Sequence, residues 1–281
     1  MNYKAGVAET FNRVAATYDR SGVEFFTPMG RRLVELVAPP TGGRVLDIGC
    51  GRGACLFPAA DSVGPNGEVV GIDIAPRMVH EARKEANRIE LNNVELLVMD
   101  AESPQFAPAT FDVITGSFSL IFLPDSFGAL TKFRRLLAPG GRLGFTSPVF
   151  NHDDFPFLPP IFAEIITDEI LRHVPDEWHP HRLIERYYGW LVDHDKLVST
   201  LAATGFSNVT SYDEPVPMVT KSGHDWVSWS YTQGMRLLWN NLPAEQQRRL
   251  RTSIIEKLDS RRSADGLITL DMPVRYVIAD A

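Results

Sequence analysis

Short apolar runs alternate with amphipathic stretches through the first half of the chain. The runs are rich in Val, Ile, Leu and Phe, which is typical of strands that are covered on both faces, and the stretches between them have helical spacing. This alternation predicts a parallel sheet built from βαβ units. The five runs are RVLDI (44–48), EVVGIDI (68–74), VELLVMD (94–100), FDVITGSF (111–118) and GRLGFTSPV (141–149).

The pattern changes on either side of these runs. About 40 mostly helical residues precede the first strand, and residues 151–190 are rich in aromatic residues, proline and histidine. A helix over 194–206 and a strand near 208–218 follow, then a helical block over 223–262 and a closing strand. We therefore expect an α/β fold: a doubly wound, Rossmann-like, mostly parallel sheet of seven strands with helical cap insertions.

The second helical block contains a regular apolar repeat. Val227, Tyr231, Met235, Leu238 and Leu242 recur at spacings of 4, 4, 3 and 4. This spacing predicts one apolar helical face. Such a face could line a binding site or join two copies of the chain in a homodimer, and the sequence leaves both interpretations open.

The composition is that of an ordinary globular protein, with 281 residues, 44% apolar and 22% charged. A net charge of −7 without a dense basic patch argues against nucleic-acid binding. No apolar run reaches the roughly 18 residues of a membrane span, and the N-terminus lacks a signal-peptide core. Cys50 and Cys55 suit neither a disulfide framework nor a zinc site, so we expect buried thiols and a cytoplasmic location.

Three successive predicted strands end in an acid: Asp47, Asp73 and Asp100. The carboxyl ends of parallel strands meet at one edge of the sheet, where open α/β folds bind ligands. Asp73 lies 20 residues past Gly53, where a carboxylate commonly accepts hydrogen bonds from ribose hydroxyls. A single such acid is ordinarily a turn or capping residue, but three in register favour a ligand site.

A glycine-rich loop follows the first of these acids, with Gly49, Gly51 and Gly53 in the spacing G-x-G-x-G. Glycines let the chain turn sharply and bring backbone N–H groups against a ligand. Dinucleotide-binding loops instead read G-x-G-x-x-G and hold a pyrophosphate. Asp47, two residues ahead of the loop, would repel a pyrophosphate but attract an ammonium group. The loop therefore favours S-adenosylmethionine, an adenosine with a charged amino-acid tail.

Residues from about 10 to 150 resemble the class I S-adenosylmethionine-dependent methyltransferases. Within that class they are most similar to the group that contains the ubiquinone and menaquinone C-methyltransferases and many methyltransferases of bacterial secondary metabolism. The matching pieces are Phe11-Asn12-x-x-Ala15-x-x-Tyr18-Asp19, Val45-Leu46-Asp47-Ile48-Gly49-Cys50-Gly51-x-Gly53, Gly71-Ile72-Asp73-Ile74-Ala75-x-x-Met78, Asp100-Ala101-Glu102, Phe111-Asp112-x-Ile114 and Leu136-Leu137-x-Pro139-Gly140-Gly141.

The resemblance implies a cofactor-binding role at each matching position, with S-adenosylhomocysteine as the product. On the methionine side the glycine loop would hold the chain of the amino acid, Asp47 would face its ammonium group and Tyr18 would close over its carboxylate. Packing alone is the other interpretation of Tyr18. On the adenosine side Asp73 would hold the ribose and Asp100 the adenine amino group. The implied positions are Tyr18, Asp47, Gly49, Cys50, Gly51, Gly53, Asp73, Ile74, Met78, Asp100, Ala101, Glu102 and Ser117.

The sulfonium donor is already activated, so the enzyme mainly positions a nucleophile and excludes water. A hydroxyl acceptor needs a general base, most often a histidine, whereas an electron-rich carbon needs one only after transfer. We select His152, Asp154 and His181 as catalytic candidates, His152 first because it follows the fifth strand closely; a solvent-facing loop histidine is the alternative. Other candidates in this region are Asp153, His179, Tyr187, Tyr188 and His194. A third ligand beside His179 and His181 is not evident, so we expect no metal.

The insertions are rich in aromatic residues, which suits a small, largely apolar acceptor. These aromatic residues are Phe155, Phe157, Phe162, Trp178, Trp190, Trp226, Trp229 and Trp239. We expect O- or C-methylation in secondary metabolism. The alternatives are a nicotinamide-dependent oxidoreductase, or a member of this fold that binds the donor without methyl transfer or catalyses a related reaction such as cyclisation.

We expect a single methyltransferase domain over residues 1–281. Within it, residues 1–40 would cover the cofactor and residues 41–150 would bind it. The insertions 151–192 and 220–262 would cap the acceptor site, and residues 263–281 would form the closing strand.

Overall fold

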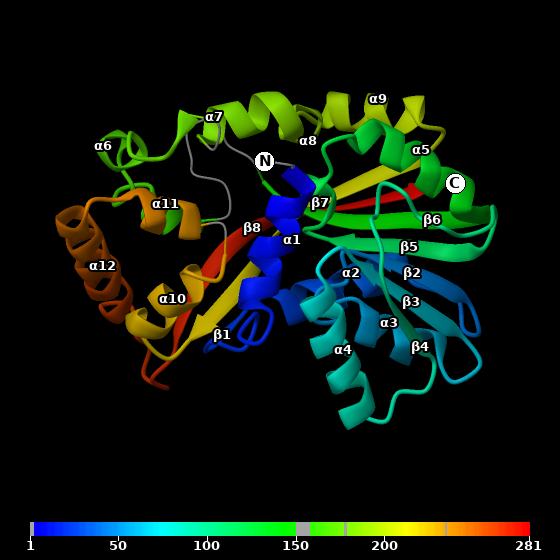
Figure 1. The fold of residues 1–281 in the computed structure, drawn as a ribbon, viewed down its shortest axis with the longest axis horizontal. Helices are drawn as coiled ribbons and strands as arrows, with labels where there is room; N and C mark the ends of the chain where they lie inside the picture. The colour runs from blue at the N-terminus through cyan, green and yellow to red at the C-terminus, as the bar shows by residue number, and fades with distance from the viewer. Residues whose placement is uncertain (1–2, 150–157, 177–178, 234) are drawn as a thin grey trace.

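The computed structural model describes residues 3–149, 158–176, 179–233 and 235–281. Its centre is an eight-stranded sheet in the order β1-β7-β8-β6-β5-β2-β3-β4 (Figure 1). The strands are β1 (Val23–Glu24), β2 (Arg44–Ile48), β3 (Glu68–Asp73), β4 (Val94–Val98), β5 (Phe111–Ser117), β6 (Leu137–Pro148), β7 (Ser207–Thr220) and β8 (Ile268–Asp280).

Strands β4, β3, β2, β5 and β6 are parallel, whereas β8 runs antiparallel between β6 and β7. The expected doubly wound, mostly parallel sheet is confirmed. The expected number of seven strands is wrong, because β1 adds an eighth at the edge by pairing Val23 with Thr220 and Glu24 with Val219. A two-residue strand is too short to show any period in the sequence.

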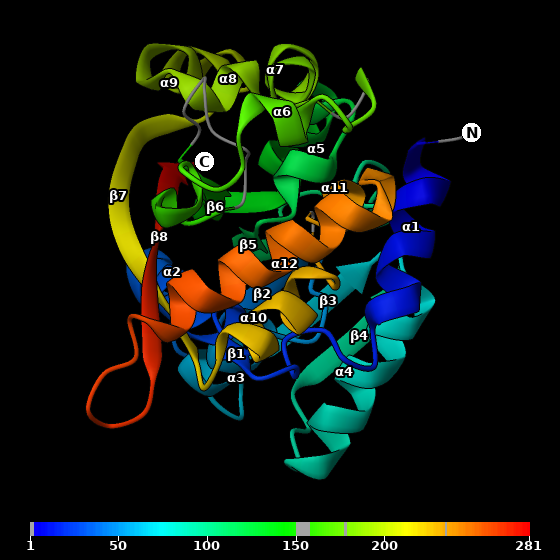
Figure 2. The ribbon, with the colours of Figure 1, turned by 90° about the vertical axis from the view of Figure 1, so that its left-hand side faces the viewer.

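Helices cover both faces of the sheet, which explains the continuous apolar runs: Val45 to Ile48 in β2 and Val69 to Ile72 in β3 are all buried. Both views place α5 and α9 at the top of the molecule, together with the first insertion (Figures 1 and 2). The helices of the core are α1 (Tyr3–Val14), α2 (Phe26–Val37), α3 (Leu56–Val63), α4 (Pro76–Arg88), α5 (Ser126–Leu136) and α9 (His194–Ala203). No described helix is long and apolar enough to cross a bilayer.

The first insertion consists of short helical pieces: η2 (Pro160–Phe162), α6 (Asp168–Leu171), α7 (Pro180–Leu183), the π-helix η4 (Ile184–Tyr188) and α8 (Gly189–Val192). The second contains α10 (Gly223–Ser230), α11 (Arg236–Asn241) and α12 (Ala244–Asp259). Of these, α10 contacts both α12 and β1.

The apolar repeat of the second insertion is interrupted. The prediction of one helical face over 227–242 is wrong, because α10 ends at Ser230 and α11 begins at Arg236. The hydroxyls of Ser230 and Thr232 donate to the carbonyls of Val227 and Trp229, at 2.7 Å in each case. Side-chain bonds of this kind compete with helical backbone geometry. The repeat describes burial correctly but not helix continuity.

Candidate active site

β2 carries Asp47 to the carboxyl edge of the sheet, where the carboxyl group is 2% exposed. The hydroxyl of Thr115 on the neighbouring β5 donates to Oδ1 at 2.8 Å. Oδ2 is buried and has no hydrogen-bond partner in the described chain. Burial raises the pKa of Asp47 to about 7; the charge of Asp73 adds to this effect and the Thr115 hydrogen bond opposes it. A cation placed against Oδ2 would therefore stabilise the ionised form of Asp47.

The glycine loop after β2 leaves no room for a side chain at two of its three glycines. Gly49 and Gly53 have φ values of 61° and 95°, in the left-handed region. A Cβ on Gly49 would lie 2.5 Å from the Ser119 Cβ, and one on Gly53 would lie 2.4 Å from the Phe57 ring. Gly51, between them, has open space where a side chain would stand and lines the cavity, so a ligand can approach the backbone closely there.

Asp73 at the end of β3 braces this loop. Its Oδ2 accepts the N–H of Gly51 at 2.9 Å and its Oδ1 accepts the N–H of Ala75 at 2.8 Å. Each carboxylate oxygen has a second lone pair, so both bonds leave room for ribose hydroxyls. Burial raises the pKa of Asp73 as well.

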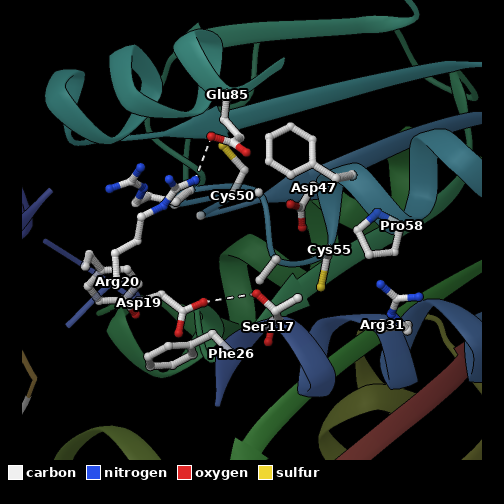
Figure 3. Close-up of a pocket in the computed structure, with 18 of the residues that line it drawn as sticks. Asp19, Arg20, Phe26, Arg31, Asp47, Cys50, Cys55, Pro58, Glu85 and Ser117 are labelled. Carbon is white, nitrogen blue, oxygen red and sulfur yellow. Dashed lines mark hydrogen bonds and ion pairs between the residues drawn. The ribbon is translucent and has the colours of Figure 1, made fainter. Parts of the chain in front are cut away.

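A cavity of about 270 Å³ opens beside the loop (Figure 3). Most predicted residues of the methionine side line it together: Tyr18, Asp47, Gly49, Cys50, Gly51, Gly53 and Ser117. The Tyr18 ring stacks on Phe26 with the centroids 5.0 Å apart. Burial raises the pKa of the Cys50 and Cys55 thiols, so these groups are neutral wall residues.

Asp19 is a cavity carboxylate to which the sequence analysis assigned no role. Its Oδ2 accepts the Thr27 hydroxyl at 3.1 Å, whereas the buried Oδ1 has no partner in the described chain. Burial raises the pKa of Asp19 to about 6, against the effect of the Thr27 bond. The "Tyr-Asp" pair of the sequence motif was the available signal.

Two arginines that the sequence analysis also missed bring positive charge to the cavity. Arg31 lies on α2 and has no ion pair with any described residue (Figure 3). Arg52, inside the glycine loop, donates through Nη1 to the carbonyls of Ala15 and Ala16, at 2.9 Å each. Its Nε is buried and has no partner in the described part of the chain. Nη2 of Arg52 pairs with Glu81 at 3.9 Å, so Nε is its free donor. The cavity thus combines carboxylate oxygens without a partner with the free Nε of Arg52 and the guanidinium of Arg31, an arrangement that is complementary to a zwitterion.

The residues predicted for the adenosine side lie outside this cavity, beneath α1. Met78 is fully buried against Val14, Ala15 and Ala75. Asp100 accepts the Lys4 ammonium at 2.7 Å, and Lys4 also pairs with Glu102. Ile74 and Ala101 are half-buried. In this structure α1 takes the contacts that the sequence analysis gave to adenosine.

The backbone turns abruptly where β5 ends at the cavity. Phe118 has a φ of 49°, which is uncommon for a bulky residue and marks strain at functional sites. Its N–H donates to the Thr146 hydroxyl at 3.1 Å, and that hydroxyl lies 3.2 Å from the Ser117 hydroxyl. The Ser119 hydroxyl is buried without a partner among described residues. Hydroxyl groups and aromatic rings therefore surround the expected methyl-donor end.

Of the three catalytic candidates, only His181 falls within the described residues, and it does not line the cavity. His152, Asp153 and Asp154 lie outside the described residues. His181 is exposed on α7, and its ring stacks on His179 at 5.3 Å. The described segments contain no group of three or more His, Cys, Asp or Glu residues that could hold a metal.

Comparisons with known proteins agree with this geometry. The family described as "Methyltransferase domain" matches residues 40–221. Aklanonic acid methyltransferase DauC from Streptomyces sp. (strain C5) is 54% identical over 208 residues, covering 74% of this chain and 94% of that protein. Nocamycin O-methyltransferase from Saccharothrix syringae is 36% identical over 273 residues, covering 95% of each. The crystal structure of the YcgJ protein from Bacillus subtilis has a similar fold, with a TM-score of 0.57 at 20% identity over 90% of this chain and 98% of that one.

Proposed function

The chain belongs to the methyltransferase family that uses S-adenosylmethionine, and from this premise we propose that it methylates a carboxylate oxygen of a small, largely apolar acceptor in secondary metabolism. The name of the relative at 54% identity states an acid as the acceptor, and the name of the relative at 36% identity states an oxygen as the methylated atom. A carboxylate is ionised at neutral pH, so positioning and exclusion of water suffice for transfer.

The observation that carries the donor assignment is the pattern of unmatched charges in the cavity. Oδ2 of Asp47 and Oδ1 of Asp19 are buried acceptors for the ammonium of the methionine part. Arg31 and Nε of Arg52 are the donors for its carboxylate. When bound, S-adenosylmethionine supplies an activated methyl group on a sulfonium centre. The protein residues fix its orientation and exclude water.

The adenosine part requires α1 to move. We assign Asp73 to the ribose hydroxyls, Ile74 and Met78 to the adenine face, and Asp100 with the Ala101–Glu102 segment to the adenine amino group. Asp100 then exchanges the Lys4 ammonium for a neutral N–H donor. The N-terminal segment 1–40 acts as a cover over a cofactor-binding core at 41–150, with the two insertions over the acceptor.

A carboxylate acceptor makes the catalytic candidates dispensable as bases. Transfer to a carboxylate releases no proton, so none of His152, Asp154 and His181 is needed as a base. A hydroxyl acceptor would instead require one of them as a base. A homodimer would need another surface than the 227–242 repeat, because Val227 and Leu238 are buried within a single chain.

The test is methyl transfer with a product that identifies the atom. The purified chain is incubated with methyl-labelled S-adenosylmethionine and aklanonic acid, and the extracted product is treated with dilute alkali. A methyl ester releases its label as volatile methanol, whereas a methyl ether or a C-methyl group keeps it. Alkali-stable label would refute carboxylate methylation, and absence of transfer would refute this acceptor. Binding of S-adenosylhomocysteine, followed by calorimetry, tests the donor site separately.

A further inference from the structure

Aromatic side chains from separate parts of the sequence form a continuous row that begins at the cavity. Phe26, which stacks on Tyr18, lies 6.3 Å from Trp229 between ring centroids. Trp229 lies 6.0 Å from Trp226, and Trp226 lies 4.4 Å from Phe162. The row therefore leads from the donor cavity to the place where the two insertions pack against each other.

The second insertion is held directly against the cavity wall. α10, which carries both tryptophans, lies beside β1 (Figures 1 and 2). A Cβ on Gly22 would lie 3.3 Å from the Asp225 Cβ, so α10 rests on the segment between Tyr18 and α2. Phe118, next to Ser117, also lies 6.3 Å from Phe26. One end of the row thus adjoins the expected methyl-donor end.

Both tryptophans of the row carry an unused donor. Trp226 and Trp229 are 0% and 3% exposed, and neither Nε1–H has a hydrogen-bond partner in the described chain. Trp239 on α11, equally buried, donates its Nε1–H to the Ser230 hydroxyl at 2.9 Å. Native proteins pair nearly all buried N–H groups, and an unpaired one costs stability. These two donors, whose rings lie 6.0 Å apart between centroids, are therefore available to a ligand.

We propose that the indole N–H groups of Trp226 and Trp229 donate hydrogen bonds to oxygen atoms of the methyl acceptor, whose flat, apolar ring system lies along the aromatic row. The inference rests on the proposed function and adds the acceptor's binding residues. Aromatic faces suit a planar, unsaturated body, and the two donors select molecules with carbonyl or carboxylate oxygens at its edge. Since both indoles are covered in this structure, the acceptor enters by displacing part of the insertions.

The test compares single Trp→Phe variants, which keep an aromatic ring and remove the N–H donor. Trp226→Phe and Trp229→Phe are each expected to raise KM for aklanonic acid about 10-fold, with kcat and the affinity for S-adenosylhomocysteine unchanged. Trp239→Phe is the matched control: it removes a hydrogen bond that is made, so it lowers Tm and leaves KM unchanged.

A spectroscopic measurement separates hydrogen bonding from packing. The indole ¹⁵N–¹H resonances are assigned from the signal missing in each Phe variant. Aklanonic acid added to the complex with S-adenosylhomocysteine is expected to move the Trp226 and Trp229 signals downfield and to leave that of Trp239 in place.

The outcomes distinguish this inference from the proposed function. If the wild-type protein methylates aklanonic acid, but both Phe variants keep the wild-type KM and the acceptor does not move the Trp226 and Trp229 signals of the wild type, the inference is refuted and the function stands. If Trp239→Phe raises KM as much as the other two, packing explains the effect and the inference is again refuted. If the wild-type protein neither binds nor methylates this acceptor, both fail together.

Discussion

The buried carboxyl group of Asp47 makes the stability of the protein depend on pH. Burial raises its pKa from 3.8 to about 7 in the folded state. Between these values the unfolded chain has released its proton and the folded protein has not, so stability falls as pH rises. The difference corresponds to about 4 kcal/mol. This cost is absent below about pH 4 and is present in full above about pH 7.

The substitution Asp47→Asn removes the ionisable group and keeps its shape. The amide oxygen can still accept the Thr115 hydroxyl, which bonds Oδ1 at 2.8 Å in the wild type. We expect the variant to be more stable than the wild type at pH 8, by as much as about 4 kcal/mol, and the difference to vanish toward pH 4. The same variant should bind S-adenosylhomocysteine about 10-fold more weakly, because the ammonium group loses its buried counter-charge.

The assay is urea unfolding without ligand, repeated from acid to alkaline pH. Asp61→Asn serves as the control, because Asp61 lies on the same cavity but is exposed. Its effect on stability should be much smaller than that of Asp47→Asn, because its side chain is already in contact with water. A variant Asp47→Asn that is less stable than the wild type at pH 8, or whose stability difference is independent of pH, would refute the reasoning.

Three further substitutions test the remaining contacts of the cavity and its cover. Arg31→Met should weaken S-adenosylhomocysteine binding about 10-fold by calorimetry and leave Tm unchanged, since this arginine has no ion pair with a described residue; an unchanged affinity would exclude it from the site. Arg52→Met should release the end of α1 and speed chymotryptic cleavage at Tyr18 in the ligand-free protein, and an unchanged cleavage rate would contradict this. Lys4→Met should raise the association rate of S-adenosylhomocysteine several-fold in stopped-flow measurements, because Asp100 loses its competing partner; a slower association would show that Lys4 assists entry.

The core of the fold could be predicted because its signals are local. Each parallel strand contains a short apolar run, and β2, β3 and β4 carry Asp47, Asp73 and Asp100 at or just past their carboxyl ends, which lie at one edge of the sheet. The residues of the glycine loop were found for the same reason. The two-residue β1 could not be predicted, because it exists only through its pairing with β7. The break after Ser230 could not be predicted either, because side-chain hydrogen bonds end the helix there.

The missed residues of the site share a physical feature. Asp19, Arg31 and Arg52 are ordinary charged residues in sequence, and their interest lies in atoms that lack a partner. The same is true of the indole groups of Trp226 and Trp229. Whether a buried donor is satisfied depends on what the folded chain places beside it, which neither composition nor spacing records. Sequence motifs therefore predict where a site lies, whereas buried polar atoms without a partner indicate which groups of a ligand it can bind.

One end of the proposed donor site is open in this structure and the other is occupied by α1. This difference favours binding of the complete cofactor over either of its parts. The methionine end is an open cavity with unmatched charges, whereas at the adenosine end Asp100 and Met78 are engaged by α1. A free amino acid can pair with the charged groups of the cavity, but it makes no contacts that would compensate for moving α1. Only a ligand that carries both parts recovers the contacts that α1 gives up. Its amino-acid part binds first to the charged groups of the cavity, and the adenosine part then competes with Lys4 and Val14 at raised effective concentration. The affinity for the complete cofactor should therefore exceed what either fragment alone can reach by displacing the helix.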